Sequence, residues 1–388
     1  MRIRVFLLVS LLLGLVGCGN DSSTSAGTAR DYSGTASVGD FLSISLDPVA
    51  MTLNYTNHSN GDTGTVPYTV NSDGSYTLND PSGNLVAAYE VPNFGLLIEA
   101  NKVGPGHATP ALITAMLKSS ISLAAISGQD YNYLQFRTAA GGVDTGHISI
   151  DASGNVQSTG FWPYGLEQGS DAFTGNNFSY SQVQQGGSGT YMTLSDAGGN
   201  GTDYIFAAAN GGFIVDTPNG AIVAIKQAAS GPAFDPSVAG TYNGAYYQKT
   251  NVTCCTTVGN NTNVEMTGTV VLGQAVITIG IDANGNGTLS ATNSSGTQIL
   301  PTVTLQPVGS QSILPAPVYS PGNTNPNVAL TNQCSGMFVG QVSRGAAGYQ
   351  DIFVTFMPGA VLFGNFRPLA GGNNEYNYLY GVAMNGQQ

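Results

Sequence analysis

Blocks of sequence that recur about every hundred residues constrain the fold of this chain more than any other feature. A tyrosine with small polar neighbours opens each of three segments, at Tyr32, Tyr131 and Tyr242. Deeper in the chain, residues 70–79 align without gaps with residues 281–290. Matches of this kind indicate a chain built from copies of one structural unit.

A third match joins the first two copies. Residues 94–99, Phe-Gly-Leu-Leu-Ile-Glu, parallel residues 211–216, Gly-Gly-Phe-Ile-Val-Asp, and residues 109–115 parallel residues 217–224. We therefore expect units at residues 31–127, 128–236 and 237–388.

Alternating apolar and polar residues in these units run into Asp-Gly or Asn-Gly pairs and then resume, which is the pattern of β-hairpins with tight turns. Residues 41–46, Phe-Leu-Ser-Ile-Ser-Leu, show the alternation clearly. We expect an all-β protein with very little helix, made of tandem antiparallel β-sandwich or β-barrel modules of about seven or eight strands each. The pattern does not decide between sandwich and barrel. Four turns share the form Asp-x-x-Gly-Asn, at residues 80–84, 151–155, 196–200 and 282–286.

Residues 111–125 have the composition of a helix, but the matching residues 221–229 have a strand pattern, so we expect a strand in the first half. The third unit carries a proline-rich stretch, which excludes a central strand and predicts an ordered excursion or linker. Residues 375–380 predict a last strand that closes this unit. The prolines are Pro301, Pro307, Pro315, Pro317, Pro321 and Pro326.

The first residues form a separate region. Arg2 and Arg4 precede an apolar run over residues 5–16. The run is too short to span a bilayer as a mature helix, so it indicates a removable export signal.

The run ends in Leu15-Val16-Gly17-Cys18. These four residues resemble the lipobox of bacterial lipoproteins. The resemblance implies that residues 1–17 are removed and that the acylated thiol of Cys18 holds the protein to a membrane. Gly19 in place of Asp implies delivery to the outer membrane where the cell has one. Residues 18–30 then read as a flexible tether.

Three further cysteines, Cys254, Cys255 and Cys334, lie in the third unit. Export permits disulfides, and an odd count allows one bridge with a remaining thiol, or an intermolecular bond. We expect Cys334 to pair with Cys254 or Cys255. No histidine lies near them in sequence, which argues against a zinc site.

The formal net charge is −12, and only 8% of the residues are charged. Binding of nucleic acid needs a Lys/Arg surface, so this partner class is excluded. The same sign argues against a second, electrostatic hold on anionic lipid.

Catalytic signatures are scarce. The sequence has no Gly-x-Ser-x-Gly motif for a hydrolase nucleophile. His58, His107 and His147 have no metal-ligand spacing, and we interpret them as surface or turn residues. A carboxylate pair for glycoside hydrolysis is a matter of spatial separation, which sequence does not give. No catalytic residue and no cofactor is assigned.

Two stretches are candidates for ligand binding. Asp282, Asn284 and Asn286 match the start of an EF-hand calcium loop, but Asn293 replaces the final bidentate Glu, and a hairpin turn accounts for the same residues. Trp162 and Tyr164 flank Pro163, which favours a loop on which exposed rings stack on sugars or contact a protein. The alternative is that these rings cap the core.

The sequence therefore predicts an exported, lipid-anchored β-repeat protein that acts without catalysis, in surface binding, adhesion or scaffolding. Its expected partners are the membrane, through the anchor, and a polysaccharide or a protein. The alternatives are a carbohydrate-binding lipoprotein that uses Trp162 and Tyr164, and a carboxylate-based glycoside hydrolase.

Overall fold

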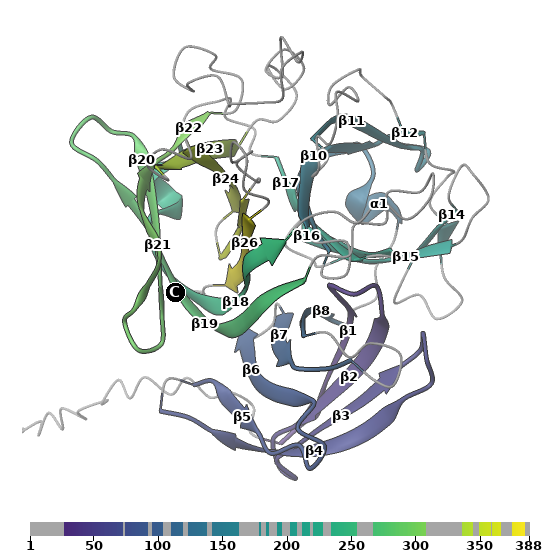
Figure 1. Ribbon diagram of the computed structural model, residues 1–388. Helices are drawn as coiled ribbons and strands as arrows, with labels where there is room; N and C mark the ends of the chain where they lie inside the picture. The colour runs from purple at the N-terminus through teal and green to yellow at the C-terminus, as the bar shows by residue number, and fades with distance from the viewer. Residues whose placement is uncertain are drawn as a thin grey trace, which may run out of the picture.

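Antiparallel strands, mostly paired with the next strand along the chain, make up almost all of the regular secondary structure in the described residues (Figure 1). The all-β prediction is confirmed. No helix in the part of the chain described below is long and apolar enough to cross a membrane. The computed structural model describes residues 27–72, 74–91, 95–103, 110–118, 123–137, 142–162, 178–179, 184–185, 192–195, 202–207, 212–217, 220–227, 234–253, 267–307, 336–343, 349–357, 359–365 and 375–384.

The first sheet is a closed barrel in which each strand pairs with the next and β8 pairs back onto β1. An up-and-down barrel leaves no exposed sheet edge. The choice between sandwich and barrel is thereby decided for this unit. Its strands are β1 (Arg30–Ala36), β2 (Phe41–Asp47), β3 (Thr52–Asn57), β4 (Thr63–Val70), β5 (Tyr76–Leu78), β6 (Leu85–Val91), β7 (Gly95–Ala100) and β8 (Ala111–Leu117).

The second sheet curls into a nearly closed barrel of the same kind, in the order β12-β11-β10-β9-β17-β16-β15-β14-β13. Along the chain its first long strand is β9 and its last is β17, and these two pair with each other as β1 and β8 do. Its elements are α1 (Leu123–Ile126), β9 (Gln129–Arg137), β10 (Gly142–Ile150), β11 (Val156–Trp162), β12 (Phe178–Ser179), β13 (Gln184–Gln185), β14 (Met192–Ser195), β15 (Thr202–Ala207), β16 (Gly212–Thr217) and β17 (Gly220–Lys226).

The third sheet follows the same plan, in the order β21-β20-β19-β18-β26-β25-β24-β23-β22. Its last strand, β26, pairs with its first, β18, as predicted. The elements are the 3-10 turn η2 (Pro236–Val238), β18 (Gly240–Thr253), β19 (Thr267–Ile281), β20 (Gly287–Asn293), β21 (Gln298–Thr304), β22 (Gln306–Pro307), β23 (Met337–Ser343), β24 (Tyr349–Met357), β25 (Ala360–Asn365) and β26 (Glu375–Met384).

The tyrosine repeats mark the first strand of each barrel. Tyr32, Tyr131 and Tyr242 lie on β1, β9 and β18, and each is buried in the apolar core inside its own barrel. The match of residues 94–99 to residues 211–216 also joins equivalent strands, β7 and β16. The sequence repeat therefore reflects repeated topology at these two places.

The alignment of residues 70–79 with residues 281–290 has a different origin. The first block holds the β4–β5 connection, whereas the second holds the β19–β20 connection, which corresponds to β2–β3 of the first barrel. Both connections are the same tight turn, with Gly74 and Gly285 each at a φ of +82°. The prediction that these blocks occupy equivalent positions is wrong, because turn chemistry alone makes them alike.

Other local predictions have mixed outcomes. The first half of residues 111–125 is the strand β8, as predicted, and a single helical turn, α1, follows. Ile126 of α1 packs in the core of the second barrel, so that unit begins before residue 128. Pro301 and Pro307 lie in strands β21 and β22, at the two ends of the sheet order, where a strand tolerates proline. The remaining prolines of that stretch lie outside the described residues.

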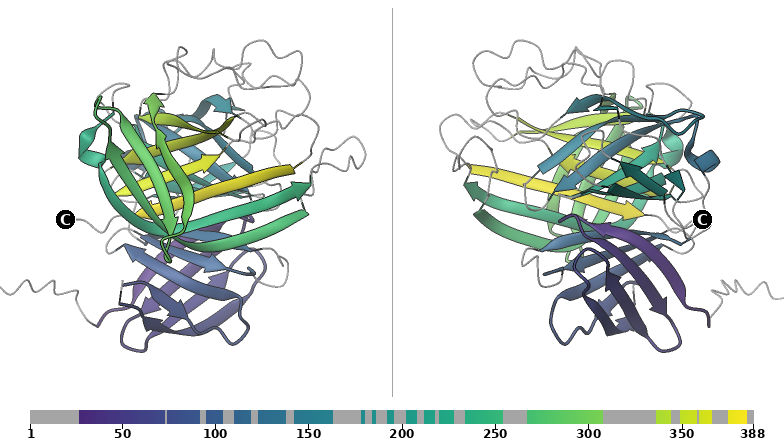
Figure 2. Two further views of the ribbon diagram at one scale, coloured as in Figure 1. Left: turned by 60° about the vertical axis from the view of Figure 1, so that its left-hand side comes forward. Right: turned by 90° about the vertical axis from the view of Figure 1, so that its right-hand side faces the viewer.

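A further apolar core lies between the three barrels, and we call it the central core. Figures 1 and 2 show the barrels grouped around it. Strands of every pair of barrels meet there: β1 and β8 contact β16, β7 contacts β18, and β17 contacts β24. Its buried residues are Tyr89, Leu97, Leu112, Met116, Leu134, Phe136, Phe206, Ile214, Val223, Ile225, Ala245, Tyr247, Met337, Val339, Phe353, Ala360, Leu362 and Val382.

The central core explains the strands that do not alternate. In β2, inward residues are buried and outward residues are half-buried. In β7 and β16 every residue is buried, because one face lines a barrel and the other faces the central core. A run of consecutive apolar residues is the sequence pattern of a strand covered on both faces.

Two carboxylates enter the shared region between barrels. Glu99 of β7 is on the same face as Leu97, is 5% exposed, and accepts a bond from the Tyr89 hydroxyl at 3.3 Å. Asp216 of β16 accepts a 2.5 Å bond from the Thr35 hydroxyl of the first barrel. Burial raises the pKa of Glu99 to about 7.

Replacement of Glu99 by Gln tests this burial. Because the folded-state pKa lies above the ordinary value, the folded protein loses stability as pH rises from about 4.5 through about 7. We expect Glu99→Gln to remove this loss and to raise the unfolding free energy at pH 8 by on the order of 3 kcal/mol, with little change at pH 4. Chemical denaturation at both pH values measures the difference. An equal effect at the two pH values would contradict the assignment.

Candidate functional site: the N-terminal end of the first barrel

The end of the first barrel at which β1 begins gathers polar residues from distant parts of the chain. Consecutive strands are antiparallel, so the β2–β3, β4–β5 and β6–β7 connections lie at this same end. We call it the N-terminal end. It brings together Arg30 from β1, Tyr76 from β5 and Glu90 from β6.

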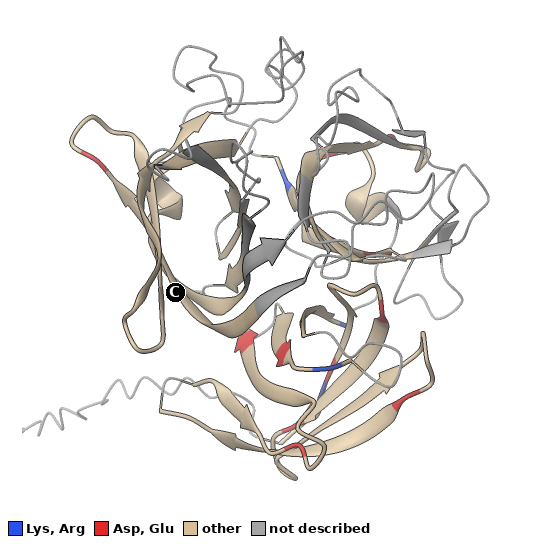
Figure 3. Cartoon of the chain, viewed as in Figure 1, with Lys and Arg blue, Asp and Glu red and all other residues tan. Residues whose placement is uncertain are grey.

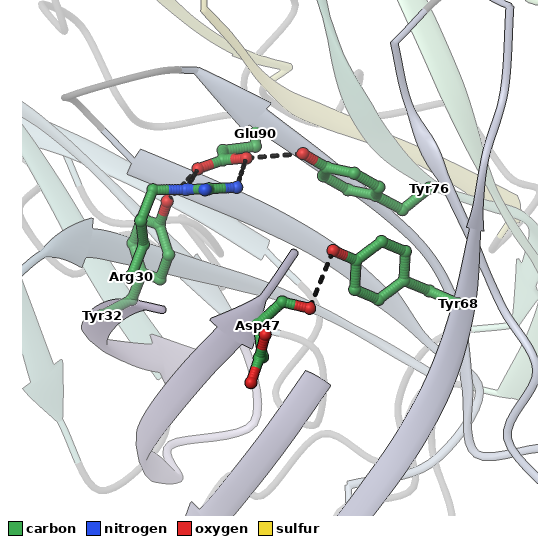
Figure 4. A network of polar contacts seen from close by, with 6 residues as sticks. All are labelled: Arg30, Tyr32, Asp47, Tyr68, Tyr76 and Glu90. Carbon is green, nitrogen blue, oxygen red and sulfur yellow. Dashed lines mark hydrogen bonds and ion pairs between the residues drawn. The ribbon is translucent and has the colours of Figure 1, made fainter. Parts of the chain in front are cut away.

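A carboxylate is the centre of a network of polar side chains at this end (Figure 4). Arg30 contacts Glu90 with two nitrogens, Nε on Oε1 and Nη2 on Oε2, the latter at 2.7 Å. The hydroxyl of Tyr32 donates to Glu90 Oε1. The hydroxyl of Tyr76 donates to Glu90 Oε2 at 2.5 Å. Four bonds therefore reach one carboxylate.

The network keeps Glu90 ionised. Burial alone would raise the pKa of Glu90, but the bonds from Arg30, Tyr32 and Tyr76 outweigh it and hold the pKa below its ordinary value. Burial and the bond to Glu90 raise the pKa of Tyr32 and of Tyr76. Both tyrosines therefore remain protonated donors, and neither is a base near neutral pH.

A second layer of contacts extends the network toward the β2–β3 connection. The ring of Tyr68 meets that of Tyr76 edge-on, with centroids 4.8 Å apart. The Tyr68 hydroxyl donates to the backbone carbonyl of Asp47 at 3.2 Å (Figure 4). The network thus ties strands β1, β4, β5 and β6 to the last residue of β2.

In the other two barrels, the hydroxyl of the equivalent tyrosine donates its hydrogen bond to a different kind of acceptor. Tyr131 donates to the carbonyl of Ile126 in α1 at 3.0 Å, and Tyr242 donates to the carbonyl of Val238 in η2 at 2.7 Å. Ile126 and Val238 are themselves buried in the barrel cores. In those barrels the preceding chain folds into a helical turn at the barrel end, whereas in the first barrel Glu90 accepts the tyrosine bond.

The β2–β3 connection forms an apolar tip on the N-terminal end, residues 48–51. Val49 is 72% exposed and Met51 is 39% exposed. Oδ1 of Asp47 accepts bonds from the backbone N–H of Val49 at 2.8 Å and of Ala50 at 2.9 Å. The side chain of Asp47 therefore holds the turn while the apolar side chains point outward.

Met51 has a backbone conformation that favours glycine. Its φ is 52°, the only positive φ of a non-glycine residue in the described chain. The corresponding turns of the second and third barrels place Gly154 and Gly285 at φ values of 85° and 82°. A side chain in this region costs roughly 1–2 kcal/mol. These two turns are one residue shorter than residues 48–51, and each has a glycine at its left-handed position, where the first barrel has a methionine.

The two buried glutamates of the first barrel do not form a pair for acid–base catalysis. Glu90 points into the barrel, whereas Glu99 lies on the outer face of the wall with Leu97. Paired catalytic carboxylates must flank one bond. Among the described residues, no group of three His, Cys, Asp or Glu is arranged to hold a metal ion.

The residues singled out from the sequence are distributed as follows. The backbone of Trp162 ends strand β11, opposite Thr145, rather than lying on a loop as predicted, because pairing with β10 continues to that residue. Tyr164 lies outside the described residues. So do Cys18, Cys254, Cys255 and Cys334.

The proposed calcium residues form a hairpin turn. Oδ1 of Asp282 accepts the backbone N–H of Asn284 at 2.8 Å and of Asn286 at 2.9 Å. Its Oδ2 accepts the Asn286 side-chain amide at 3.0 Å. The same bonds recur around Asp151 in the second barrel. The turn accounts for these residue types without an ion.

The histidine interpretation holds for one residue and fails for another. His58 is exposed and stacks on Phe41 at 4.6 Å. His147, predicted at the surface, is buried on β10 and lies 3.1 Å from Asp130. Burial lowers its pKa despite this carboxylate. His107 lies outside the described residues.

The sequence does not predict the Arg30–Glu90 network. Arg30 and Glu90 are 60 residues apart, and no motif joins them. The available signal is an acid at an inward position of β6, two residues after inward-facing Ala88.

Neither models of known protein families nor curated protein sequences match this chain.

Glu90→Gln tests the network. The substitution removes the charge opposite a half-buried Arg30 and one acceptor site, so we expect a loss of about 2–3 kcal/mol at pH 7. Because the folded-state pKa of Glu90 is depressed, its contribution is present above about pH 4.5 and is lost as pH falls further. Tyr76→Phe is the milder control, with an expected loss of about 1 kcal/mol. Equal stability of Glu90→Gln and wild type at pH 7 would refute the role of this carboxylate.

Met51→Gly tests the backbone strain at the tip. We expect the unfolding free energy to rise by about 1 kcal/mol, because glycine adopts this φ without steric cost. Gly285→Ala is the matched control at the equivalent turn of the third barrel, where nothing lies within 4 Å of an added Cβ. It should destabilise by about 1 kcal/mol. A change of stability in the same direction for both substitutions would contradict backbone strain at Met51.

Proposed function

We propose that this chain is an exported lipoprotein, anchored by acyl chains on Cys18, whose three barrels act as a non-enzymatic scaffold or binding surface outside the cytosol. The observation that carries the proposal is the central core. Because the central core covers part of the barrel walls and apolar side chains fill the barrel interiors, the walls outside the central core and the barrel ends are the surfaces that meet partners.

The chemistry of the buried carboxylates supports a role without catalysis. Glu90 accepts four bonds from its neighbours, and Glu99 lies between barrels. A catalytic acid or base has to reach substrate in a cleft with a pKa suited to proton transfer. The hydrogen bonds from Arg30, Tyr32 and Tyr76 to Glu90 instead hold strands β1, β5 and β6 together at the barrel end.

The closure of that end supports an anchor on the preceding chain. In the second and third barrels, α1 and η2 supply the backbone carbonyl that accepts the hydrogen bond of the tyrosine hydroxyl. In the first barrel, Glu90 of β6 supplies the acceptor, so the Tyr32 hydroxyl needs no carbonyl from the chain that precedes β1. An anchor on that preceding chain is therefore compatible with the closed barrel end.

The surface charge supports a neutral or weakly polar partner. Acidic and basic residues are scattered along the described chain rather than clustered (Figure 3). A net charge of −12 disfavours polyanions. Hydroxyl and amide side chains then provide the contacts, which suits a polysaccharide or a protein.

Metabolic labelling with palmitate tests the anchor directly. We expect the full chain, expressed in a bacterium that acylates lipoproteins, to incorporate label and to lose Met1. Cys18→Ser should abolish the label, whereas the matched control Cys254→Ser should keep it. Label retained by Cys18→Ser, or an intact Met1 on the wild type, would disprove the proposal.

A further inference from the structure

We propose that the apolar tip, residues 48–51, inserts into the lipid surface to which Cys18 is anchored, so that the molecule stands on the N-terminal end of its first barrel. The inference rests on the proposed function and adds a second, non-covalent contact with the same membrane. Stable membrane attachment commonly combines two such signals.

The place of the tip in the fold is the first argument. The described chain enters β1 at Arg30, and Arg30 pairs with Leu46 on β2, one residue before Asp47. The tip therefore lies beside the point at which the chain from Cys18 arrives. About a dozen residues separate Cys18 from Arg30, with an r.m.s. span of roughly 20 Å if flexible. An anchor of that length holds this end of the barrel close to the lipid.

The chemistry of the tip is the second argument. Val49 at 72% and Met51 at 39% are among the most exposed large apolar residues of the described chain. Val70, at the end of β4 on the same barrel end, is 56% exposed. Apolar side chains that project together from a barrel end lose their contact with water when they enter the lipid interface.

The backbone of the tip is also prepared for an apolar surrounding. An N–H group without a partner is costly in lipid. Asp47 accepts the N–H groups of Val49 and Ala50, and the carbonyl of Met51 accepts the N–H of Tyr68 at 2.9 Å. These backbone groups therefore enter the interface already bonded.

The strain at Met51 is the third argument. The corresponding turns of the other two barrels are one residue shorter and have Gly154 and Gly285 at the left-handed position, which glycine adopts without steric cost. A strained residue that persists at an exposed position points to a use for its side chain. A methionine at the tip supplies flexible apolar surface that glycine does not.

The charges at this end favour neutral lipid. Arg30 is paired with Glu90; the other charged groups beside the start of β1 are Asp31 and Lys118, which directly follows β8, and Asp47 lies at the turn. This set has no excess of basic residues, so attraction to anionic headgroups does not contribute. The contact is apolar and should be insensitive to salt.

Photo-crosslinking in the acylated full chain tests the inference. Benzoylphenylalanine replaces Val49 in one variant and Val86 in the control; Val86 is also exposed, at 37%, but lies near the opposite end of the barrel. Both proteins are reconstituted into vesicles of phosphatidylcholine and phosphatidylethanolamine. We expect several-fold more lipid adduct from position 49 than from position 86, at low and at high salt. Equal adducts, or adducts from position 49 only to protein, would overturn the inference.

A second variant separates the tip from its neighbours. With the probe at Val70, Val49→Ser combined with Met51→Ser should lower lipid adducts several-fold, whereas Val86→Ser should leave them unchanged. No decrease in the double variant would overturn the role of the tip. The anchor is read separately from palmitate label on Cys18: a labelled, membrane-bound chain without tip adducts defeats this inference alone, and an unlabelled chain defeats the proposed function with it.

Discussion

Apolar contact between the outer walls of three barrels is the interaction on which the rest of this structure depends. A barrel wall that faces water alternates apolar and polar residues, but β7 and β16 are buried on both faces, and their outward apolar residues, Leu97 and Ile214, join those of other strands in the central core. Such strands would leave large apolar patches exposed on an isolated barrel, which soluble proteins avoid. The central core covers them, and so it determines which walls lie inside the assembly and which ends point outward. The N-terminal end of the first barrel is one of these outward ends.

The same core carries buried carboxylates at one repeated position. Glu99 and Asp216 follow the same number of residues after the start of β7 and β16, and each is buried beside a neighbouring barrel. Asp216 reaches across to Thr35, whereas Glu99 bonds Tyr89 of its own barrel. Buried carboxylates cost stability unless they are bonded or protonated. Hydrogen bonds of this kind specify the relative orientation of two barrels, because they need defined geometry, whereas apolar contact is less directional.

The sequence predicts the repeated β-architecture well, because hairpin turns and strand alternation are local signals. Asp151 and Asp282 predict their turns, because each carboxylate accepts hydrogen bonds from backbone N–H groups within the same five-residue segment. Closure into barrels and the Arg30–Glu90 network are not predictable in this way, because they join residues far apart in the chain. Residues 70–79 align with residues 281–290 although the two blocks lie at different places in their barrels. The same turn sequence occurs wherever the chain needs this turn, whatever its place in the topology.

The central claim is that the three barrels form one body on a shared core. Differential scanning calorimetry of the mature chain tests it most directly, because separate bodies unfold in separate steps. The account predicts a single transition in which the calorimetric and van't Hoff enthalpies agree. Three resolved transitions, each with the enthalpy of a single barrel, would contradict it.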